Sequence, residues 1–317
     1  MLPIPVSTDR RHHGFILRRT ALLNRSRATN LTVLGLAAIA CLSLLFNLHV
    51  YFSGATSPSS SPLNKLASLP DLQHNLNHLI IVPGHGIWKG TNPSPEFRTR
   101  IDNWAFETFQ TAPEPHRLEV FFQHISKAVE LALADERSLV VFSGGHTQRT
   151  STTTEGESYL RMAFSAGLFH SETFSRATSE GFAMDSYQNL LFSIARFHEF
   201  TGRYPEQITV VGYEMKRARF VDLHRAAIRW PETQFTYIGI DVDGDNSQAK
   251  QGERENGYLP YRSDLYGCHT YLANKRRQRN HDARYPSYYS SSPELWPLLV
   301  WCPSDPTKLF SGPLPWS

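Results

Sequence analysis

The residues of this chain that can perform acid–base chemistry or bind an anion lie just after four segments that read as β-strands. Three of these segments are short, β-branched and apolar without alternation, a pattern typical of strands covered on both faces. In an open α/β sheet, the loops that follow the carboxyl ends of the strands converge on one crevice. We therefore expect one shared site built from the following side chains: His85, Ser143, His146, Glu180, Asp185, Asn189, Glu214, Lys216 and Arg217.

Two glycine turns close the first two of these strands. Gly84-His85-Gly86 follows one strand, and Ser143-Gly144-Gly145-His146 follows the other. Glycines allow backbone N–H groups to approach a ligand, and the N-terminus of a following helix favours negative charge. Each turn by itself is more often a simple tight turn. Their occurrence at equivalent strand ends favours a site for a phosphate or a carboxylate.

Four carboxylates are candidates for general-base chemistry or for a divalent metal such as Mg²⁺, which prefers oxygen ligands. Asp185 and Asn189 stand four residues apart and share a helix face. Asp185 is also an ordinary acid at a helix N-terminus, so a capping role is slightly favoured for it. For Glu180 a role in the site is favoured. Physical arguments alone do not decide which of Glu155 and Glu157 belongs to the site, since either can be an acid in the first turn of a helix.

Lys216, Arg217 and Arg219 place three cations within four residues after a strand, where they would offer charges to a phosphate. The alternative is a solvated helix start, but cations are disfavoured at a helix N-terminus. An acidic ligand or Glu180 should therefore compensate them. The short basic run at 275–279 has no aromatic platform beside it. We interpret that run as a solvated turn and expect no nucleic-acid partner.

The elements that must position these side chains alternate between strand and helix. This order predicts an α/β, Rossmann-like, three-layer domain with a mostly parallel sheet. Thr154 and Glu157 form a capping-box pattern at the start of one helix. Residues 87–113 should begin as a loop, and beyond residue 243 the periodic pattern dissolves. The expected strands cover residues 78–83, 138–142, 173–180, 207–212 and 234–240, and the expected helices cover 117–136, 155–167, 185–201 and 215–229.

One N-terminal transmembrane helix is expected before the domain. Residues 31–52 contain no formally charged side chain and would form a helix of roughly 33 Å, enough to cross a bilayer core. Six arginines against one acid in residues 1–30 place that end in the cytosol and the domain in the lumen of the Golgi or endoplasmic reticulum. A cleaved signal peptide and a mitochondrial presequence, hence a mitochondrial membrane, are the alternatives. The expected parts are a basic cytosolic tail (1–30), a signal anchor (31–52), a flexible stalk (53–77), the α/β domain (78–243) and a C-terminal extension (244–317) that packs on the domain or is partly disordered.

The chain has three cysteines, of which Cys41 lies in the apolar N-terminal segment. Cys268 and Cys302 can pair in an oxidising lumen, and two unpaired buried thiols are equally compatible with the sequence. No Cys-x-x-Cys pair occurs, which argues against a structural zinc site of that kind. The sequence also lacks the glycine-rich phosphate loops and the G-x-S-x-G nucleophile elbow.

Motifs spread over residues 78–241 resemble the domain-of-unknown-function 218, or YdcF-like, family, and the tail resembles its fungal, membrane-anchored branch. The matching motifs are Ser143-Gly144-Gly145 after a strand, T-E-x-x-S-Y at 154–159, E-x-x-x-x-D-S-x-x-N at 180–189, and Arg217-Ala218. Glu214 departs from the pattern, since bacterial members usually carry a histidine there. Bacterial relatives are linked to cell-envelope processes, and one binds S-adenosylmethionine. The resemblance implies a Rossmann-like domain whose pocket uses Gly144, Gly145, Glu155, Glu180, Asp185, Asn189 and Arg217.

Together these observations predict a membrane-anchored protein that binds, and hydrolyses or transfers, a phosphorylated small molecule or lipid headgroup. A non-catalytic module for a nucleotide or S-adenosylmethionine and a structural lumenal protein are the alternatives. The expected cofactor is a divalent metal or S-adenosylmethionine, and the expected partners are the membrane, through residues 31–52, and a small anionic ligand. The expected catalytic residues are Glu180, Asp185 and Arg217, and the expected ligand-binding residues are Gly84, His85, Ser143, Gly144, Gly145, His146, Glu155, Asn189 and Lys216.

Overall fold

The computed structural model describes residues 30–49, 75–106, 115–171 and 173–317. The expectations for the cytosolic tail, for the end of the apolar segment and for most of the stalk lie outside these residues. The chain divides into two compact units, Met1–Leu69 and Pro70–Ser317. We describe each unit by itself.

The first unit contains one apolar helix, Asn30–His49, of 20 residues with a mean hydropathy of 2.3. None of it is buried against protein, so its leucine-rich surface has no apolar partner in the described chain. At 1.5 Å per residue the helix is roughly 30 Å long, which matches the hydrocarbon core of a bilayer. A helix of this kind is either a membrane anchor or a signal sequence.

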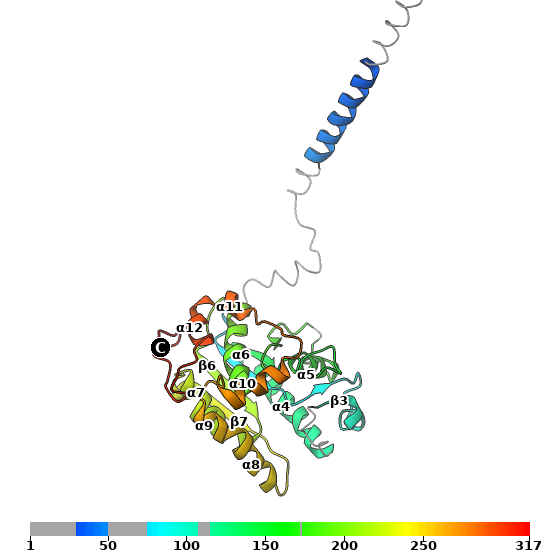
Figure 1. The fold of residues 1–317 in the computed structure, drawn as a ribbon. Helices are drawn as coiled ribbons and strands as arrows, with labels where there is room; N and C mark the ends of the chain where they lie inside the picture. The colour runs from blue at the N-terminus through cyan, green and yellow to red at the C-terminus, as the bar shows by residue number, and fades with distance from the viewer. Residues whose placement is uncertain (1–29, 50–74, 107–114, 172) are drawn as a thin grey trace, which may run out of the picture. The chain divides into compact units, whose positions relative to one another are not determined.

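The second unit is an α/β domain built on a parallel five-stranded sheet, which confirms the predicted fold class (Figure 1). The strand order is β5-β4-β1-β6-β7, so the chain builds outward from β1 to one edge and then crosses back to build the other. Each expected strand has a counterpart. The strands are β1 (His78–Pro83), β4 (Ser138–Ser143), β5 (Ala177–Glu180), β6 (Gln207–Gly212) and β7 (Phe235–Gly239).

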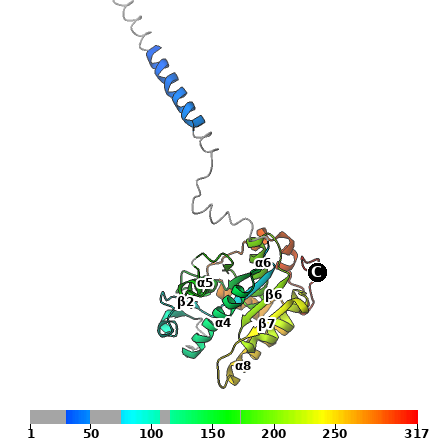
Figure 2. The same ribbon diagram turned by 180° about the vertical axis from the view of Figure 1, so that it is seen from behind.

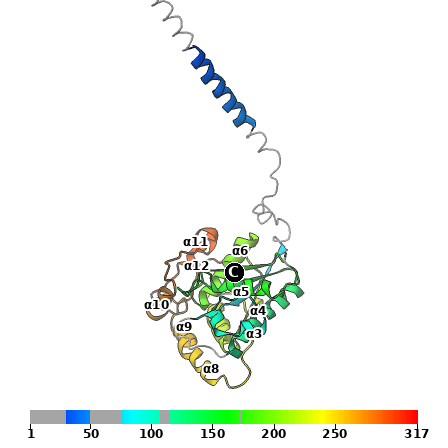
Figure 3. The ribbon, with the colours of Figure 1, turned by 90° about the vertical axis from the view of Figure 1, so that its right-hand side faces the viewer.

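Helices cover both faces of this sheet. Alternate side chains of β1 enter two separate apolar clusters, with Leu79 and Ile81 in one and Ile80 and Val82 in the other. The first cluster is completed by α6, by the helical segment after β6 and by the C-terminal residues, and the second by α4 and α5. Figure 2 shows the same body from behind. Figure 3 shows it from the side, with α8 (Ser247–Glu253) at the end opposite α11 (Tyr288–Ser291) and α12 (Trp296–Leu299). The helices that sandwich the sheet are α4 (Pro115–Ala134), α5 (Glu155–Ser165), α6 (Ser186–Thr201) and α7 (Arg225–Ala227).

Two helix starts follow the chemistry predicted from the sequence. The Thr154 side chain accepts from the Glu157 backbone N–H, and the Glu157 side chain accepts from the Thr154 N–H, so the capping box at α5 is confirmed. Asp185 caps α6 by accepting from the Gln188 N–H, and Gly202 ends that helix in the left-handed region at φ 73°. These caps fix where α5 and α6 begin relative to the sheet.

Two expectations about secondary structure were wrong. The region after β1 contains a short antiparallel pair, β2 (Ile87–Trp88) with β3 (Trp104–Ala105), besides its loops. The segment after β6 is not one α-helix, because it passes from η3 (Glu214–Lys216) through a π-helical stretch, η4 (Arg219–His224), before α7. Residues beyond 243, where the sequence shows no periodic pattern, contain further short elements. They are α8 (Ser247–Glu253), η6 (Arg254–Tyr258), α9 (Leu259–Ser263), α10 (Thr270–Arg279), α11 (Tyr288–Ser291), η7 (Pro293–Leu295) and α12 (Trp296–Leu299).

The C-terminal residues are part of the domain. Tyr266, Tyr288 and Leu295 are almost completely buried in the same apolar cluster as α6. A disulfide joins Cys268 to Cys302, which decides between the two alternatives left open by the sequence. The extension therefore packs on the sheet layer and brings its own side chains to the carboxyl ends of the strands.

Candidate functional site

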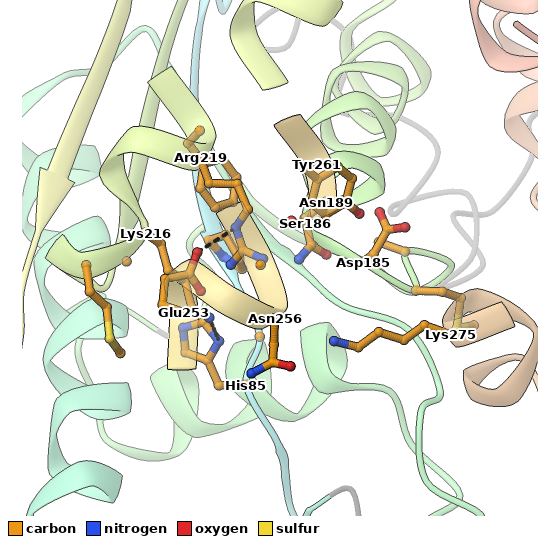
Figure 4. A pocket seen from close by; sticks show the side chains of 18 of the residues that line it. His85, Asp185, Ser186, Asn189, Lys216, Arg219, Glu253, Asn256, Tyr261 and Lys275 are labelled. Atoms are coloured by element: carbon orange, nitrogen blue, oxygen red, sulfur yellow. Dashed lines mark hydrogen bonds and ion pairs between the residues drawn. The ribbon is translucent and has the colours of Figure 1, made fainter. Parts of the chain in front are cut away.

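A cavity of about 370 Å³ lies at the carboxyl ends of the central strands. Pro83 at the end of β1, the two residues after it and Gly212 at the end of β6 line the cavity, together with the loop before α6. The segment after β6 lines another side, and the C-terminal extension contributes through α8, η6, α9 and α10. Figure 4 shows Lys275 directed into this space from α10, on the other side of the cavity from Lys216 and His85. The location is the crevice expected for an open α/β sheet.

Half of the expected site residues line this cavity and half do not. The expected residues in the lining are Gly84, His85, Glu155, Asp185, Asn189 and Lys216. Those that do not line it are Ser143, Gly144, Gly145, His146, Glu180 and Arg217.

Glu180 lies beneath the site, fully buried, rather than in the cavity lining. Its carboxylate accepts from the Ser143 hydroxyl at 2.7 Å, from the backbone N–H of Phe182 at 2.6 Å and of Ala183 at 3.2 Å, and from the Tyr288 hydroxyl at 3.3 Å. Burial raises the pKa of Glu180 to about 7 in spite of these donors. The geometry makes Glu180 a connector between β4, the loop before α6 and α11.

The glycine turns do not present free amides to an anion. Gly84 donates to the Ser143 carbonyl at 2.7 Å, Gly144 to the Glu180 carbonyl at 3.0 Å, and Gly145 to the Ala183 carbonyl at 2.7 Å. Because these N–H groups already bond to the backbone, the expected Gly-Gly anion cradle was wrong. A Cβ at Gly84 or at Gly144 would lie 2.6 Å from an Oε2 of Glu155. Glycine is required there so that Glu155 can lie across both turns.

The two expected acids that line the cavity are each held by neighbours. Thr147 donates to the Glu155 carboxylate at 2.8 Å. Asp185 caps α6 with one oxygen, as the sequence favoured, and pairs with Arg276 of α10 through the other. Burial by itself would raise the pKa of Asp185, but the Arg276 guanidinium holds it below its usual range. The basic run 275–279 is therefore not a solvated turn, since it reaches the site.

Arg217 points away from the cavity. Its guanidinium donates to the Glu214 carboxylate at 2.6 Å and to the Tyr237 carbonyl at 2.8 Å, and the side chain is 44% exposed. Arg219 lines the cavity instead and pairs with Glu253 of α8 at 3.1 Å, with both side chains nearly buried. Because the chain turns through a 3-10 and then a π-helical segment here, residue spacing did not indicate which cation faces inward.

Lys216 is a half-buried cation in the cavity lining, next to the loop after β1. Its Nζ lies 3.2 Å from Nδ1 of His85 and 5.6 Å from the centre of the Tyr213 ring. Burial, reinforced by Arg219, lowers the pKa of Lys216 to about 7. Burial and Lys216 lower the pKa of His85 well below its ordinary value, so this imidazole is neutral and can accept from the ammonium. Within the described chain, Lys216 has no carboxylate within ion-pair distance.

Sequence reasoning missed several residues of the site. The Ser186 hydroxyl lines the cavity and lies 2.8 Å from Nε2 of His224, which is fully buried. Burial lowers the pKa of His224 well below its ordinary value. The serine follows Asp185 in the E-x-x-x-x-D-S-x-x-N motif, so a signal for it existed. No local signal placed the others in the cavity: Arg117, Glu253, Asn256, Tyr261, Lys275 and Arg279.

The fold and the cavity define a parallel α/β protein with a cation-rich cavity at the carboxyl ends of its strands. No family model matches the chain, and no solved structure matches it. The chain is distantly homologous to a protein of Saccharomyces cerevisiae, uncharacterized protein YOR238W. The two are 27% identical over 253 residues, which covers 64% of this chain and 83% of the yeast protein. The YdcF-like resemblance therefore stays a prediction.

Proposed function

We propose that the cavity binds a phosphorylated small molecule or a phosphorylated lipid headgroup. The observation that carries this proposal is Lys216, a half-buried cation that lines the cavity without a carboxylate at ion-pair distance in the described part of the chain. Burying an ammonium without a direct ion pair is costly, and burial lowers the pKa of Lys216 to about 7 although Glu253 and Glu155 act in the opposite direction. A phosphate would supply the missing counter-charge.

The surroundings of Lys216 support an anionic ligand. Cations reach the cavity from α4, from the segment after β6 and from α10, so an anion inside it would meet positive charge on several sides. Arg219 is fixed in place by Glu253, which gives a preorganised planar donor group beside the lysine. The neutral His85 lies against Lys216 and can exchange a proton with a bound phosphate.

The proposed setting is an endomembrane lumen, with residues 30–49 as the anchor. The Cys268–Cys302 disulfide supports an oxidising compartment. Protease protection of the domain in sealed microsomes tests this setting, and digestion of the domain without detergent would contradict it.

Binding of inorganic pyrophosphate to the full-length chain in detergent, measured by titration calorimetry, tests the ligand class. A charge-assisted hydrogen bond contributes about 1.5–3 kcal/mol, so Lys216→Met should weaken binding roughly tenfold to a hundredfold. Arg217→Met is the matched control, since it removes an adjacent cation that does not line the cavity. Absence of binding to the wild-type chain, or equal losses in both variants, would refute the proposal.

A further inference from the structure

A second cluster, independent of the anion site, lies where the loop after β4 meets the loop after α10. It consists of His146, His281 and Asp282, whose potential ligand atoms all lie within 4.8 Å of one another. The Asp282 carboxylate stands between the two rings, with one oxygen 2.7 Å from Nδ1 of His146 and the other 3.7 Å from Nε2 of His281. The two imidazole centres are 5.0 Å apart.

The hydrogen bonds on the outer sides of the rings fix their tautomers. His146 Nε2 bonds to the backbone carbonyl of Ser151, and His281 Nδ1 lies 3.0 Å from the carbonyl of Arg279. A carbonyl only accepts, so each of these nitrogens carries a hydrogen. In a neutral ring the other nitrogen then holds a lone pair. Both lone pairs point toward the carboxylate of Asp282, which when ionised also only accepts.

Three lone-pair atoms therefore face one another without a proton between them. His281 Nε2 is a buried atom with no hydrogen-bond partner in the described chain, and only 6% of its side chain is exposed. One extra proton on His146 would satisfy its contact with Asp282 but would leave His281 as it is. A divalent cation satisfies all three atoms at once. The backbone carbonyls behind the rings then act as the groups that orient metal-bound histidines.

We propose that His146, His281 and Asp282 bind a divalent transition-metal ion, with Zn²⁺ as the best fit. Two imidazoles and one carboxylate suit zinc, whereas Mg²⁺ and Ca²⁺ prefer oxygen ligands alone. Zinc ligands at about 2.0–2.2 Å from the ion stand roughly 3.4 Å apart in tetrahedral geometry, so the three atoms need only small movements. The Asp282 side chain is half-exposed and is free to make these movements. Three protein ligands leave the fourth position to water.

The ion would tie the loop after β4 to the end of α10. Thr147 and Arg279, which neighbour these ligands along the chain, line the cavity. Metal binding would therefore hold one wall of the cavity in place, whatever ligand the cavity takes.

Zinc content of the untagged full-length chain, measured after dialysis against micromolar zinc without reductant, tests this proposal. Omitting reductant keeps Cys268 and Cys302 bonded to each other, so their thiols do not compete for the ion. We expect about one zinc per wild-type chain and an affinity roughly tenfold lower or worse in His281→Ala and Asp282→Asn. Cobalt(II) should give the intense visible absorption of a four-coordinate site in the wild type only.

Asp135→Asn is the matched control, because Asp135 pairs with His78 at 2.8 Å without a second imidazole in the pair. It should bind zinc as the wild type does. If His281→Ala fails to fold, the zinc affinity of Asp282→Asn tests the proposal, because this substitution changes only a half-exposed side chain. The proposal is overturned if the wild-type chain binds no stoichiometric zinc, or if Asp282→Asn binds it as tightly as Asp135→Asn.

Discussion

The wild-type protein should lose unfolding free energy as the pH rises, because Glu180 is buried. Replacing Glu180 with glutamine should abolish this loss. The buried carboxylate has a pKa of about 7, raised by burial from the ordinary value of 4.5. A pKa that is higher in the folded state means that the folded protein prefers the protonated acid. Its stabilising contribution is complete below pH 4.5 and is lost as the pH rises through 7.

The magnitude follows from the size of the shift. A change from 4.5 to about 7, at about 1.4 kcal/mol per unit, corresponds to about 3 kcal/mol of unfolding free energy between acid and alkaline pH. Glutamine keeps the hydrogen bonds. Its oxygen can accept from Phe182 and Ala183, and its amide can donate to Ser143, whose hydroxyl can turn to Asn189 Oδ1 at 3.0 Å. The variant should then match the wild type near pH 4.5 and exceed it by about 3 kcal/mol at pH 8.

Guanidinium denaturation of Pro70–Ser317 at several pH values measures this difference, since all other titrations are common to both proteins and cancel. Parallel pH profiles for the two proteins would show that the pKa of Glu180 is the same in the folded and unfolded states, and would refute the reasoning. Pyrophosphate affinity gives a second readout. It should be nearly unchanged in the variant if Glu180 acts as a connector below the cavity, and it should be lost if Glu180 contacts the ligand.

Three further changes test other parts of the structure. Sulfate, which does not titrate in this range, should bind more weakly to the wild type as the pH rises from 6 to 9, because Lys216 loses its proton near pH 7; a flat profile would contradict this. Replacing Cys268 and Cys302 with serine opens a link across 34 residues and should lower the unfolding free energy by about 4 kcal/mol, and an unchanged denaturation midpoint would count against it. Gly156→Ala should cost about 3 kcal/mol because its Cβ would collide with the Phe142 carbonyl, whereas the control Gly252→Ala meets nothing within 4 Å and should be neutral or stabilising.

The sheet could be predicted because its strands are covered on both faces, which leaves short apolar runs in the sequence. The predicted bounds of β1 and β6 agree with the structure, and the cap at Thr154 was readable from two residues. The strand ends also indicated where a cavity should lie. Which of the side chains after a strand face the cavity was harder to predict. Lys216 and Arg217 are neighbours in sequence, and only the local 3-10 turn determines that the first faces inward and the second faces Glu214.

The contribution of the C-terminal extension could not be predicted for a different physical reason. Its helices are short and are held by long-range contacts, such as Tyr288 with Glu180 and Arg276 with Asp185. Such contacts leave no periodic signal, because each helix uses only one or two buried side chains. The basic run at 275–279 therefore looked solvated, although Lys275 enters the cavity.

The charge of the cavity discriminates between the ligand classes that the sequence left open. Two of the acids in its lining are already paired, Asp185 with Arg276 and Glu253 with Arg219. S-adenosylmethionine carries a net positive charge and would add to an excess of cations, whereas a phosphate removes that excess. Bringing like charges together in a partly buried site is costly, so the lining favours a ligand with more than one negative charge. Within the described chain, the charged side chains of the lining are Arg117, Lys216, Arg219, Lys275 and Arg279 against Glu155, Asp185 and Glu253.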